Sequence, residues 1–428
     1  MAELLSFCMV TTFYPPNHFG GDAMHVYRLS NALARRGHAV TVVHSEDAYR
    51  ALGGPERNDL FPHEAGVTLR PLRTAFPVAA ATATYVSGRP AFYGGQLEAV
   101  FREVFDVVHF HNVSLAGGPG VLRYGDGIKL YTTSEHWLVC PMHVLFRYGS
   151  EPCVQPHCLR CTLTFRRPPQ LWRYSSLLDR SARSVDLFLA PSRFTLDAHR
   201  ARGFTRPMRV LPHFLPEEDA SGADSPGPGP GQAGVRPGSD PGRGQPGRPY
   251  VLFVGRLERL KGAHVLVETF RRYRGLDLLV AGDGEERDEL EKEAAGLDHV
   301  RFLGYVPHGT LDALYRDATA LIVPSVGYEV FGLVVLEAFA RKTPVIVHDL
   351  GALPELVSDS SGGLVYRTPD QLVDAIERLR TDRALRDDLG AKGYDAWRRL
   401  WSEERHLAAY FGAVAEARET RNARGSRQ

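Results

Sequence analysis

Residues 254–262, VGRLERLKG, bring together groups that could bind a phosphate. A strand-like aliphatic run ends at a glycine, and the cations Arg256 and Lys261 come before a helical pattern begins. Glycine permits close backbone approach, a helix start supplies unpaired N–H groups, and two cations can neutralise a diphosphate. The segment therefore predicts phosphate binding, although a plain strand–helix connection with solvated charges would have the same composition. A similar junction, AGDG, follows at residues 281–284.

Two carboxylates eight residues apart, Glu329 and Glu337, form a second candidate group. If a helix begins between them, the carboxylates can accept hydrogen bonds from sugar and ribose hydroxyls, and the first N–H groups of the helix are free to bind a phosphate. Those N–H groups belong to Phe331, Gly332 and Leu333. Glu337 lies in the apolar run LVVLEAFA, where an unpaired charge is costly to bury, so we expect it to have a functional role.

The predicted strands and helices that position these residues lie in two halves of the chain, separated by a linker. Residues 221–249 contain sixteen glycines or prolines and one aliphatic residue larger than alanine, so we expect a flexible linker there. On each side, short aliphatic runs alternate with helical patterns, which indicates βαβ units and a parallel sheet. Ligands of such sheets bind at the carboxyl ends of the strands, and we expect a ligand in a cleft between the two halves.

Ten strands and six helices are predicted from hydrophobic periodicity. The strands are residues 4–10, 38–44, 107–110, 129–131 and 187–190 in the first half, and 250–254, 276–281, 300–303, 320–323 and 344–347 in the second. The helices are residues 22–36, 262–274, 285–295, 310–316, 332–341 and 369–380. We place an N-terminal domain at 1–216, the linker at 217–249, a C-terminal domain at 250–394, and a terminal helix and tail at 395–428.

Composition excludes several classes of protein. The 428 residues carry 51 Lys plus Arg against 50 Asp plus Glu, which is not the basic footprint of a nucleic-acid binder. The longest apolar stretch, 321–340, is interrupted by Pro324 and by charged residues, so we expect no transmembrane helix. The N-terminus lacks a basic region and a small-residue cleavage site, and we therefore expect a cytoplasmic protein.

Four motifs in order resemble the family-4 retaining glycosyltransferases. They are FYPPNHFGGDAMHVYRLSNALARRGHAVTVV at 13–43, the Arg256/Lys261 segment, the Glu329–Glu337 segment, and PVIVHDLGALPELV at 344–357. The resemblance covers nearly the whole chain except the linker. It implies the α/β GT-B fold, in which two Rossmann-like, doubly wound parallel-sheet domains face a cleft. It also implies a nucleotide-sugar donor held mainly by the C-terminal domain and an acceptor held mainly by the N-terminal domain.

The resemblance assigns roles to individual positions. Arg256 and Lys261 match the diphosphate-binding pair, Glu337 the carboxylate that accepts ribose hydroxyls, and Glu329 the one placed against the donor sugar. Tyr305 and Val306 fall where the family frames the nucleobase, and Gly20 and Gly21 match a glycine loop near the donor phosphates. Ser325 and Gly327 line the same cleft.

The chemistry expected from the resemblance is hexosyl transfer with retention. Loss of the nucleoside diphosphate leaves a cationic sugar and an anionic leaving group, which Arg256, Lys261 and the amides near Phe331 can stabilise. The family implies front-face attack, with the departing phosphate helping to deprotonate the acceptor and no metal needed for transfer. We expect a UDP- or GDP-sugar as donor. The acceptor is a hydroxyl of a cell-envelope glycan, a lipid-linked acceptor or a small molecule, as in polysaccharide biosynthesis.

Histidines are the main departure from the family pattern. Relatives carry His-Asp or His-Glu after the strand that here is followed by TSEH, and aligning on Glu135 puts Ser134 at the histidine position. His136 either takes over the catalytic role or packs beside Trp137. His109 and His111 end another strand and are expected to face the cleft, and the function of His213 is undetermined.

Four of the five cysteines lie within 22 residues, with twelve, four and two residues between them. They are Cys140, Cys153, Cys158 and Cys161. Four thiolates could bind a structural zinc ion or an iron–sulfur cluster and staple an insertion at 140–174, and free thiols are the alternative. Some family members have a cysteine-bearing insertion at this place.

A basic and aromatic segment, TFRRPPQLWRY, follows at 164–174. Arg166, Arg167 and Arg173 occur together with Trp172 and Tyr174. A solvated helix start is the simpler interpretation, and contact with an anionic membrane face is the alternative.

Two other functions remain as alternatives. A GT-B nucleotide-sugar epimerase would share the architecture, and a nucleotide-sugar-binding protein without activity is suggested by Ser134. The Arg/Lys and Glu/Glu pairs favour transfer over epimerisation, and turnover separates both enzymes from the binding protein.

Overall fold

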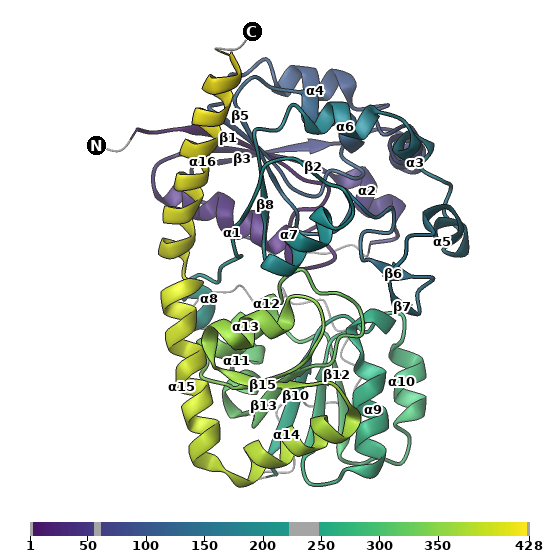
Figure 1. Ribbon diagram of the computed structural model, residues 1–428, viewed down its shortest axis with the longest axis vertical. Coiled ribbons are helices and arrows are strands. Elements are labelled where there is room, and N and C mark those ends of the chain that lie inside the picture. Colours follow the sequence, from purple (N-terminus) through teal and green to yellow (C-terminus); the bar gives the residue numbers. More distant parts are fainter. Residues whose placement is uncertain (1–2, 55–60, 222–247, 426–428) are drawn as a thin grey trace. The chain divides into compact units, whose positions relative to one another are not determined.

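The computed structural model describes residues 3–54, 61–221 and 248–425, which form two compact units (Figure 1). Unit 1 comprises Met1–Val144, His157–His213 and His406–Gln428, and unit 2 comprises Leu145–Pro156 and Phe214–Arg405. Each unit has a parallel sheet with helices, as the alternation of aliphatic and helical patterns predicts.

Unit 1 is built on a seven-stranded parallel sheet with strand order β3-β2-β1-β4-β5-β8-β9. The strands are β1 (Ser6–Val10), β2 (Ala39–Ser45), β3 (Val67–Leu72), β4 (Val107–Phe110), β5 (Ile128–Thr132), β8 (Leu187–Ala190) and β9 (Met208–Val210). The middle strands β4 and β5 are buried along their whole length, as expected for parallel strands that are covered on both faces. The strand order reverses between β1 and β4, where ligands of doubly wound sheets bind.

Ten helical segments belong to unit 1 in the part of the chain that is described. They are α1 (Gly21–Arg35), α2 (Glu46–Ala51), α3 (Pro77–Ser87), α4 (Gly94–Val100), η1 (Gly118–Arg123), α5 (Cys158–Thr164), η2 (Leu171–Tyr174), α6 (Leu177–Ala182), α7 (Arg193–Arg200) and most of α16 (Glu403–Gly425).

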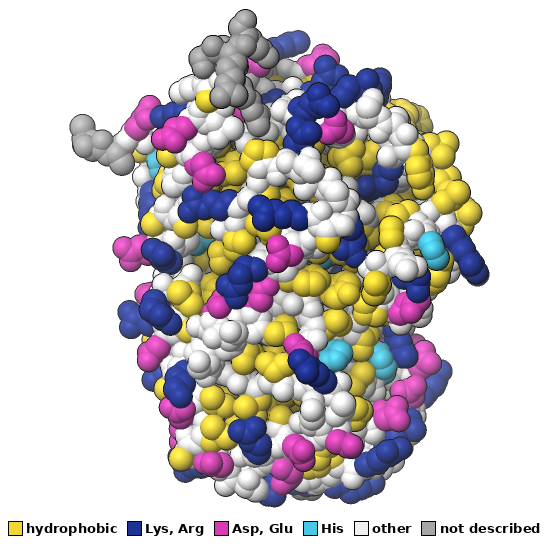
Figure 2. All heavy atoms as spheres, viewed as in Figure 1, with side chains coloured by type: hydrophobic (Ala, Val, Ile, Leu, Met, Phe, Trp, Pro, Cys, Tyr) yellow, Lys and Arg dark blue, Asp and Glu magenta, His cyan; other side chains and the backbone are white. Residues whose placement is uncertain are grey.

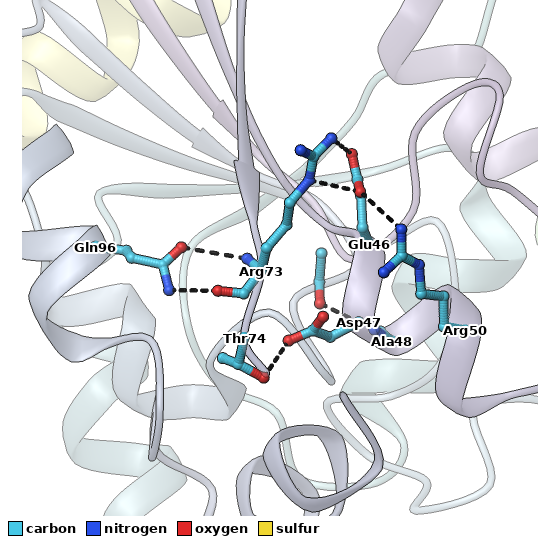
Figure 3. A network of polar contacts seen from close by, with 8 residues as sticks. Glu46, Asp47, Ala48, Arg50, Arg73, Thr74 and Gln96 are labelled. Atoms are coloured by element: carbon cyan, nitrogen blue, oxygen red, sulfur yellow. Dashed lines mark hydrogen bonds and ion pairs between the residues drawn. The ribbon is translucent and has the colours of Figure 1, made fainter. Parts of the chain in front are cut away.

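A polar network ties α2 to the end of β3 (Figure 3). The guanidinium of Arg73 donates two hydrogen bonds of 2.6 Å to the carboxylate of Glu46, and Thr74 donates one of 2.7 Å to Asp47. Gln96 of α4 bonds the backbone N–H and C=O of Arg73. These bonds fix the loops after β2 and β3 and give them a structural role.

Unit 2 is built on a six-stranded parallel sheet with strand order β12-β11-β10-β13-β14-β15. The strands are β10 (Tyr250–Val254), β11 (Asp277–Ala281), β12 (Val300–Gly304), β13 (Ala320–Val323), β14 (Val345–His348) and β15 (Gly363–Tyr366). Alternate residues of β10 enter two cores, because Leu252 packs in one cluster and Val251 and Phe253 in the other. An antiparallel hairpin of β6 (Phe146–Arg147) and β7 (Glu151–Pro152) also belongs to unit 2.

Nine helical segments belong to unit 2 among the described residues. They are α8 (Glu217–Ser221), η3 (Arg259–Lys261), α9 (Ala263–Arg272), α10 (Arg287–Glu293), α11 (His308–Asp317), α12 (Leu333–Ala340), α13 (Leu353–Ser360), α14 (Pro369–Thr381) and α15 (Arg383–Leu400).

The structure differs from the sequence-based expectations in the linker and at the C-terminal end. The predicted linker 217–249 begins with the helix α8, and its residues 222–247 lie outside the described part of the chain. The expected terminal helix is two helices, since α15 ends at Leu400 and α16 begins at Glu403. The tail also stays helical as far as Gly425.

None of the helices in the described residues combines the length and the apolar character that a membrane span requires.

Candidate active site

The candidate diphosphate-binding residues of unit 2 follow the carboxyl ends of its strands. Arg256 follows β10, and Ser325 and Glu329 follow β13, which is hydrogen-bonded to β10. Tyr305 follows β12. Parallel strands bring these loops to one edge of the sheet, where α/β proteins bind their ligands.

An ion pair between Lys261 and Glu329 lies at this edge. The ammonium group is 2.7 Å from Glu329 Oε1, and the hydroxyl of Ser325 donates to the same oxygen at 2.7 Å. The side chain of Glu329 is 15% exposed and that of Lys261 26%. Burial by itself raises the pKa of Glu329, but the Lys261 charge and the two hydrogen bonds outweigh burial and lower it. Glu329 is therefore held as a carboxylate.

The backbone at Gly262 brings Lys261 to this position. Gly262 has φ +77°, and a Cβ there would lie 2.1 Å from the carbonyl oxygen of Pro324. This close contact lets the carbonyl of Leu260 accept hydrogen bonds from the N–H groups of Val326 and Gly327. Glycine is required here because both the backbone conformation and the space exclude a side chain.

We expect Gly262→Ala to lower the free energy of unfolding by about 2–4 kcal/mol and to weaken nucleotide binding. The added methyl group must displace the backbone at Pro324, which moves Lys261 away from Glu329. Chemical denaturation monitored by fluorescence measures the first effect, and calorimetric titration with UDP measures the second. Gly309→Ala is the matched control, because a Cβ at Gly309 meets nothing within 4 Å and alanine suits a helix. Equal stability of the two variants would contradict the account.

Arg256 lies on the same loop and is more accessible than Lys261. Its side chain is 48% exposed and pairs with Glu258 at 2.5 Å. Its charge also helps to lower the pKa of Glu329. The loop therefore offers two cations close to one carboxylate.

The helix α12 begins at Leu333, two residues later than the first N–H group that the sequence assigned to it. Gly332 caps it with φ +117°, and Phe331 is 3% exposed. Glu337 is about one turn inside the helix, and the hydroxyl of Tyr315 donates to its Oε2 at 2.9 Å. This bond gives Glu337 a structural partner, and its role in ribose binding stays a prediction.

The predicted nucleobase residues differ in accessibility. Tyr305 is 53% exposed, whereas Val306 is buried in the core of unit 2. In unit 1, Gly20 precedes α1 and Gly21 is its first residue. A Cβ at Gly20 would meet nothing closer than 3.9 Å, so the chain itself does not require glycine there.

His136, the predicted catalytic histidine, is completely buried. Its ring packs against Phe194 and His199, and burial, with His199 and Arg202, lowers its pKa well below the ordinary value. Neither ring nitrogen has a hydrogen-bond partner among the described residues. The structure thus gives His136 a packing environment, and its catalytic role gains no support.

A different histidine, His143, lies beside Glu135. Its Nδ1 is 2.5 Å from Glu135 Oε2, and Asn112 donates to the same oxygen at 3.1 Å. Sequence reasoning missed His143 and Asn112, because both follow strands in irregular loops without a spacing pattern. The only available signal was that Asn112 and Glu135 each follow the end of a predicted strand.

The other histidines named from sequence form a buried cluster in unit 1. His109 lies 3.0 Å from the hydroxyl of Tyr410 and 2.8 Å from that of Thr132, and its ring packs on His111. His213 packs on His25 with ring centroids 3.9 Å apart. Each of these imidazoles is at most 3% exposed, so the expectation that His109 and His111 face a cleft is wrong.

The four clustered cysteines form no disulfide in the described part of the chain. Cys140 and Cys161 are buried, and Cys153 and Cys158 are partly exposed. Over residues 3–54, 61–221 and 248–425, no group of three or more His, Cys, Asp or Glu side chains is arranged to hold a metal ion. Cys153 belongs to unit 2 and the other three cysteines to unit 1, and the structural metal stays a prediction.

Arg173 does not belong to the basic surface that its sequence suggested. Its guanidinium lies over the rings of Trp172 and Trp137, at 4.6 and 5.4 Å from their centroids, and donates to the carbonyl of Trp137 at 2.7 Å. Burial lowers its pKa to about 10. Arg166 and Arg167 remain exposed.

Two family models match the chain. Residues 19–219 match "Glycosyltransferase Family 4", and residues 240–396 match "Glycosyl transferases group 1". Together they cover most of the chain, which belongs to the family-4 glycosyltransferases. This finding confirms the family inferred from the four motifs.

Individual relatives align over different lengths. The α-D-kanosaminyltransferase of Streptomyces kanamyceticus is 36% identical over 150 residues, which are 33% of this chain and 38% of that relative. The chain thus covers well under half of that relative. The glycogen synthase of Mycobacterium tuberculosis is 27% identical over 383 residues, 83% of this chain and 81% of the relative.

Solved structures show the GT-B fold. Sucrose-phosphate synthase from Thermosynechococcus elongatus superposes with a TM-score of 0.70 at 21% identity, covering 98% of this chain and 100% of that one. Anabaena HepE in complex with UDP and glucose superposes with a TM-score of 0.63 at 14% identity, covering 96% and 99%. The predicted fold class, with two parallel-sheet domains, is confirmed.

Proposed function

We propose that the protein transfers a hexose, with retention of anomeric configuration, from a nucleoside-diphosphate sugar to an acceptor hydroxyl. The observation that carries the proposal is the Lys261–Glu329 pair, with Ser325 and Arg256, at the carboxyl edge of the unit 2 sheet. Two cations and a carboxylate at one edge suit a ligand that has a diphosphate at one end and hydroxyls at the other.

Arg256 and Lys261 stabilise the leaving nucleoside diphosphate in this proposal. Negative charge grows on the diphosphate as the glycosidic bond breaks, and preorganised cations lower the barrier because they need no rearrangement. The backbone N–H groups of Phe331, Gly332 and Leu333, at the start of α12, add partial positive charge. We assign no metal ion to this step.

Glu329 acts at the donor sugar and Glu337 at the ribose. The carboxylate of Glu329 can accept sugar hydroxyls or lie near the developing positive charge at the anomeric carbon. Tyr315 holds one oxygen of Glu337, so that its carboxylate is oriented for hydroxyl groups. Tyr305 and Val306 frame the nucleobase, and Gly20 and Gly21 leave room for the donor. We propose UDP or GDP as the nucleotide, with UDP favoured by its presence in the HepE complex.

Release of nucleoside diphosphate from UDP-, GDP-, dTDP- and ADP-glucose tests the proposal. We expect release from one of the four in the presence of EDTA, and loss of release in Glu329→Ala. An epimerase would form the epimeric nucleotide sugar, whereas a binding protein would show ligand-induced thermal shifts without release from any donor.

We propose further that the acceptor is presented at an anionic membrane face, on the cytoplasmic side. Exposed apolar side chains gather over α3 and α5 of unit 1 (Figure 2). The α3 side chains are Phe76, which caps the helix, Val78 and Val86, and the α5 side chains are Leu159 and Leu163. The next segment, η2, adds Leu171 and Tyr174. Trp172 of η2 donates to the carbonyl of Tyr85 at 2.9 Å, which fixes η2 against α3.

We expect wild-type protein to sediment with vesicles of phosphatidylcholine and phosphatidylglycerol, but not with phosphatidylcholine alone. The variant Arg166→Ala/Arg167→Ala/Leu171→Ser/Tyr174→Ser should lose at least about tenfold in partitioning, because two cations and two apolar anchors are removed. The control Arg271→Ala/Arg272→Ala alters exposed cations of α9 and should behave as wild type. Equal sedimentation of the two variants would exclude this surface.

A further inference from the structure

The pair formed by Glu135 and His143 lies at the carboxyl edge of the unit 1 sheet. Asn112 follows β4 by two residues and Glu135 follows β5 by three, and these two strands are hydrogen-bonded neighbours. Ligands of doubly wound sheets bind outside this edge. None of the interactions assigned to the nucleotide sugar uses this pair.

The carboxylate of Glu135 is held in one orientation. Its Oε2 accepts from Asn112 Nδ2 at 3.1 Å and lies 2.5 Å from His143 Nδ1. The amide of Asn112 is itself fixed, since its Oδ1 accepts from the N–H and the hydroxyl of Ser114 at 3.2 and 2.7 Å. Its NH₂ group therefore points to Glu135.

The backbone brings His143 to Glu135 at a cost. His143 has φ +71°, which is unfavourable for a residue with a side chain. Its carbonyl accepts from the N–H of His136 at 2.8 Å, and its N–H donates to the carbonyl of Cys140 at 3.1 Å. These bonds close the loop so that the imidazole lies beside the carboxylate.

Because Nδ1 is bound to Glu135, Nε2 is the polar atom of the ring left to meet a ligand. No partner of Nε2 occurs in the described part of the chain, and the side chain keeps 18% of its surface exposed. The adjoining carboxylate disfavours a phosphate or another anion by charge repulsion. A neutral hydroxyl suits a site made of an imidazole and a carboxylate.

We propose that His143, oriented by Glu135 and Asn112, binds a hydroxyl of a neutral carbohydrate acceptor through Nε2. The proposal rests on the glycosyltransferase function proposed above and adds the chemical class of its acceptor. His143 contacts the acceptor, and Glu135 and Asn112 are positioning residues.

The test measures nucleoside-diphosphate release from the donor identified above, with and without D-glucose, D-mannose or myo-inositol. We expect at least one of the three to accelerate release by wild-type protein. His143→Ala, His143→Gln and Glu135→Gln should raise the KM of that acceptor at least tenfold, about 1.4 kcal/mol, and change the KM of the donor less than about twofold. Glu103→Gln removes a carboxylate on the same unit that pairs with Arg70, and it should leave both constants unchanged. Unfolding midpoints equal to wild type show that the variants fold.

A second measurement follows chemical modification of the His143 imidazole. Diethyl pyrocarbonate should modify His143 in wild-type protein, and the accelerating sugar should slow that modification at least about threefold. An unchanged acceptor KM in the variants, an equal rise of both constants, or no acceleration and no protection by any of the three sugars would overturn the proposal. Glu329-dependent release of nucleoside diphosphate without acceptor would still stand in those cases, so failure of the acceptor proposal is distinguishable from failure of the function.

Discussion

Lys261→Met is expected to lower kcat/KM for the nucleotide sugar by about 10²–10³-fold. The substitution keeps much of the side-chain volume and removes the cation that faces the diphosphate, and loss of one preorganised electrostatic group has this effect in other enzymes. It also leaves only Ser325 and the charge of Arg256 to oppose the effect of burial on Glu329, so the pKa of Glu329 should rise. Lys292→Met, on the exposed side of α10, is the matched control and should retain wild-type activity.

Stability separates the ion pair's structural role from its catalytic role. The side chains of Glu329 and Lys261 are 15% and 26% exposed, so the pair is intermediate between a surface and a buried ion pair. We therefore expect Lys261→Met to lower the free energy of unfolding by about 1–3 kcal/mol. Lys261→Met/Glu329→Gln removes the unpaired charge and should recover most of this loss without recovering turnover. Activity of the double variant within tenfold of wild type would show that the pair is only structural.

Acidification from pH 7.5 to 5.5 is expected to destabilise unit 1 by several kcal/mol. Five imidazoles share one buried cluster: His25 of α1, His109 and His111 at the end of β4, His213, and His406 of α16. Burial lowers all five pKa values. Neighbouring histidines reinforce it for His25, His109 and His213, whereas the hydrogen bond to the carbonyl of Pro212 partly opposes it for His406. The pKa falls to about 3 for His111 and about 4 for His406.

The direction in which the unfolding free energy changes with pH follows from proton binding. The unfolded chain binds protons near pH 6.5 and the folded chain does not, so stability is intact above pH 6.5 and is lost as pH falls towards the folded-state values. Each histidine contributes about 1 kcal/mol at pH 5.5, or about 5 kcal/mol for the cluster. Urea denaturation at the two pH values measures the difference. His111→Asn should reduce it by about 1 kcal/mol, and the same change at exposed His157 should not. Equal unfolding free energies at pH 7.5 and 5.5 would contradict this prediction.

Much of the fold could be predicted because its central strands are buried on both faces. β4, β8, β10 and β13 have the predicted bounds, since continuous aliphatic runs between polar residues leave little choice of register. Of the edge strands of the two parallel sheets, β12 was predicted, whereas β3, β9 and β15 were missed. β3 contains a charged residue and Pro71, and β15 begins at Gly363 directly after Gly362, so neither has a buried strand's pattern.

The candidate site was predictable where its residues follow predicted strands of the same parallel sheet. Lys261 and Glu329 are 68 residues apart, but each follows a strand whose carboxyl end reaches the same edge of the sheet. The positions of the other candidate residues depend on tertiary contacts that the sequence does not show. Arg173 looks like a surface cation in sequence but lies over two indole rings. His143 was missed because a positive φ and the closure of its loop have no signature in sequence.

The break between α15 and α16 has a similar cause. The apolar residues of 395–417 have helical spacing throughout, yet the carbonyl of Trp401 accepts from the N–H of Leu215 and its ring stacks on Phe339. These contacts fix Trp401 in unit 2, and the helix restarts two residues later at Glu403.

Release of nucleoside diphosphate by wild-type protein, Glu329→Ala and Lys261→Met, from the four nucleotide sugars in EDTA, tests the proposed function most directly. We expect release from one donor by the wild type, and a loss of at least about 10²-fold in both variants. Release that is equal in wild type and variants would contradict the assignment of the site at the carboxyl edge of unit 2. Absence of release from every donor, together with absence of binding in thermal-shift measurements, would contradict the function itself.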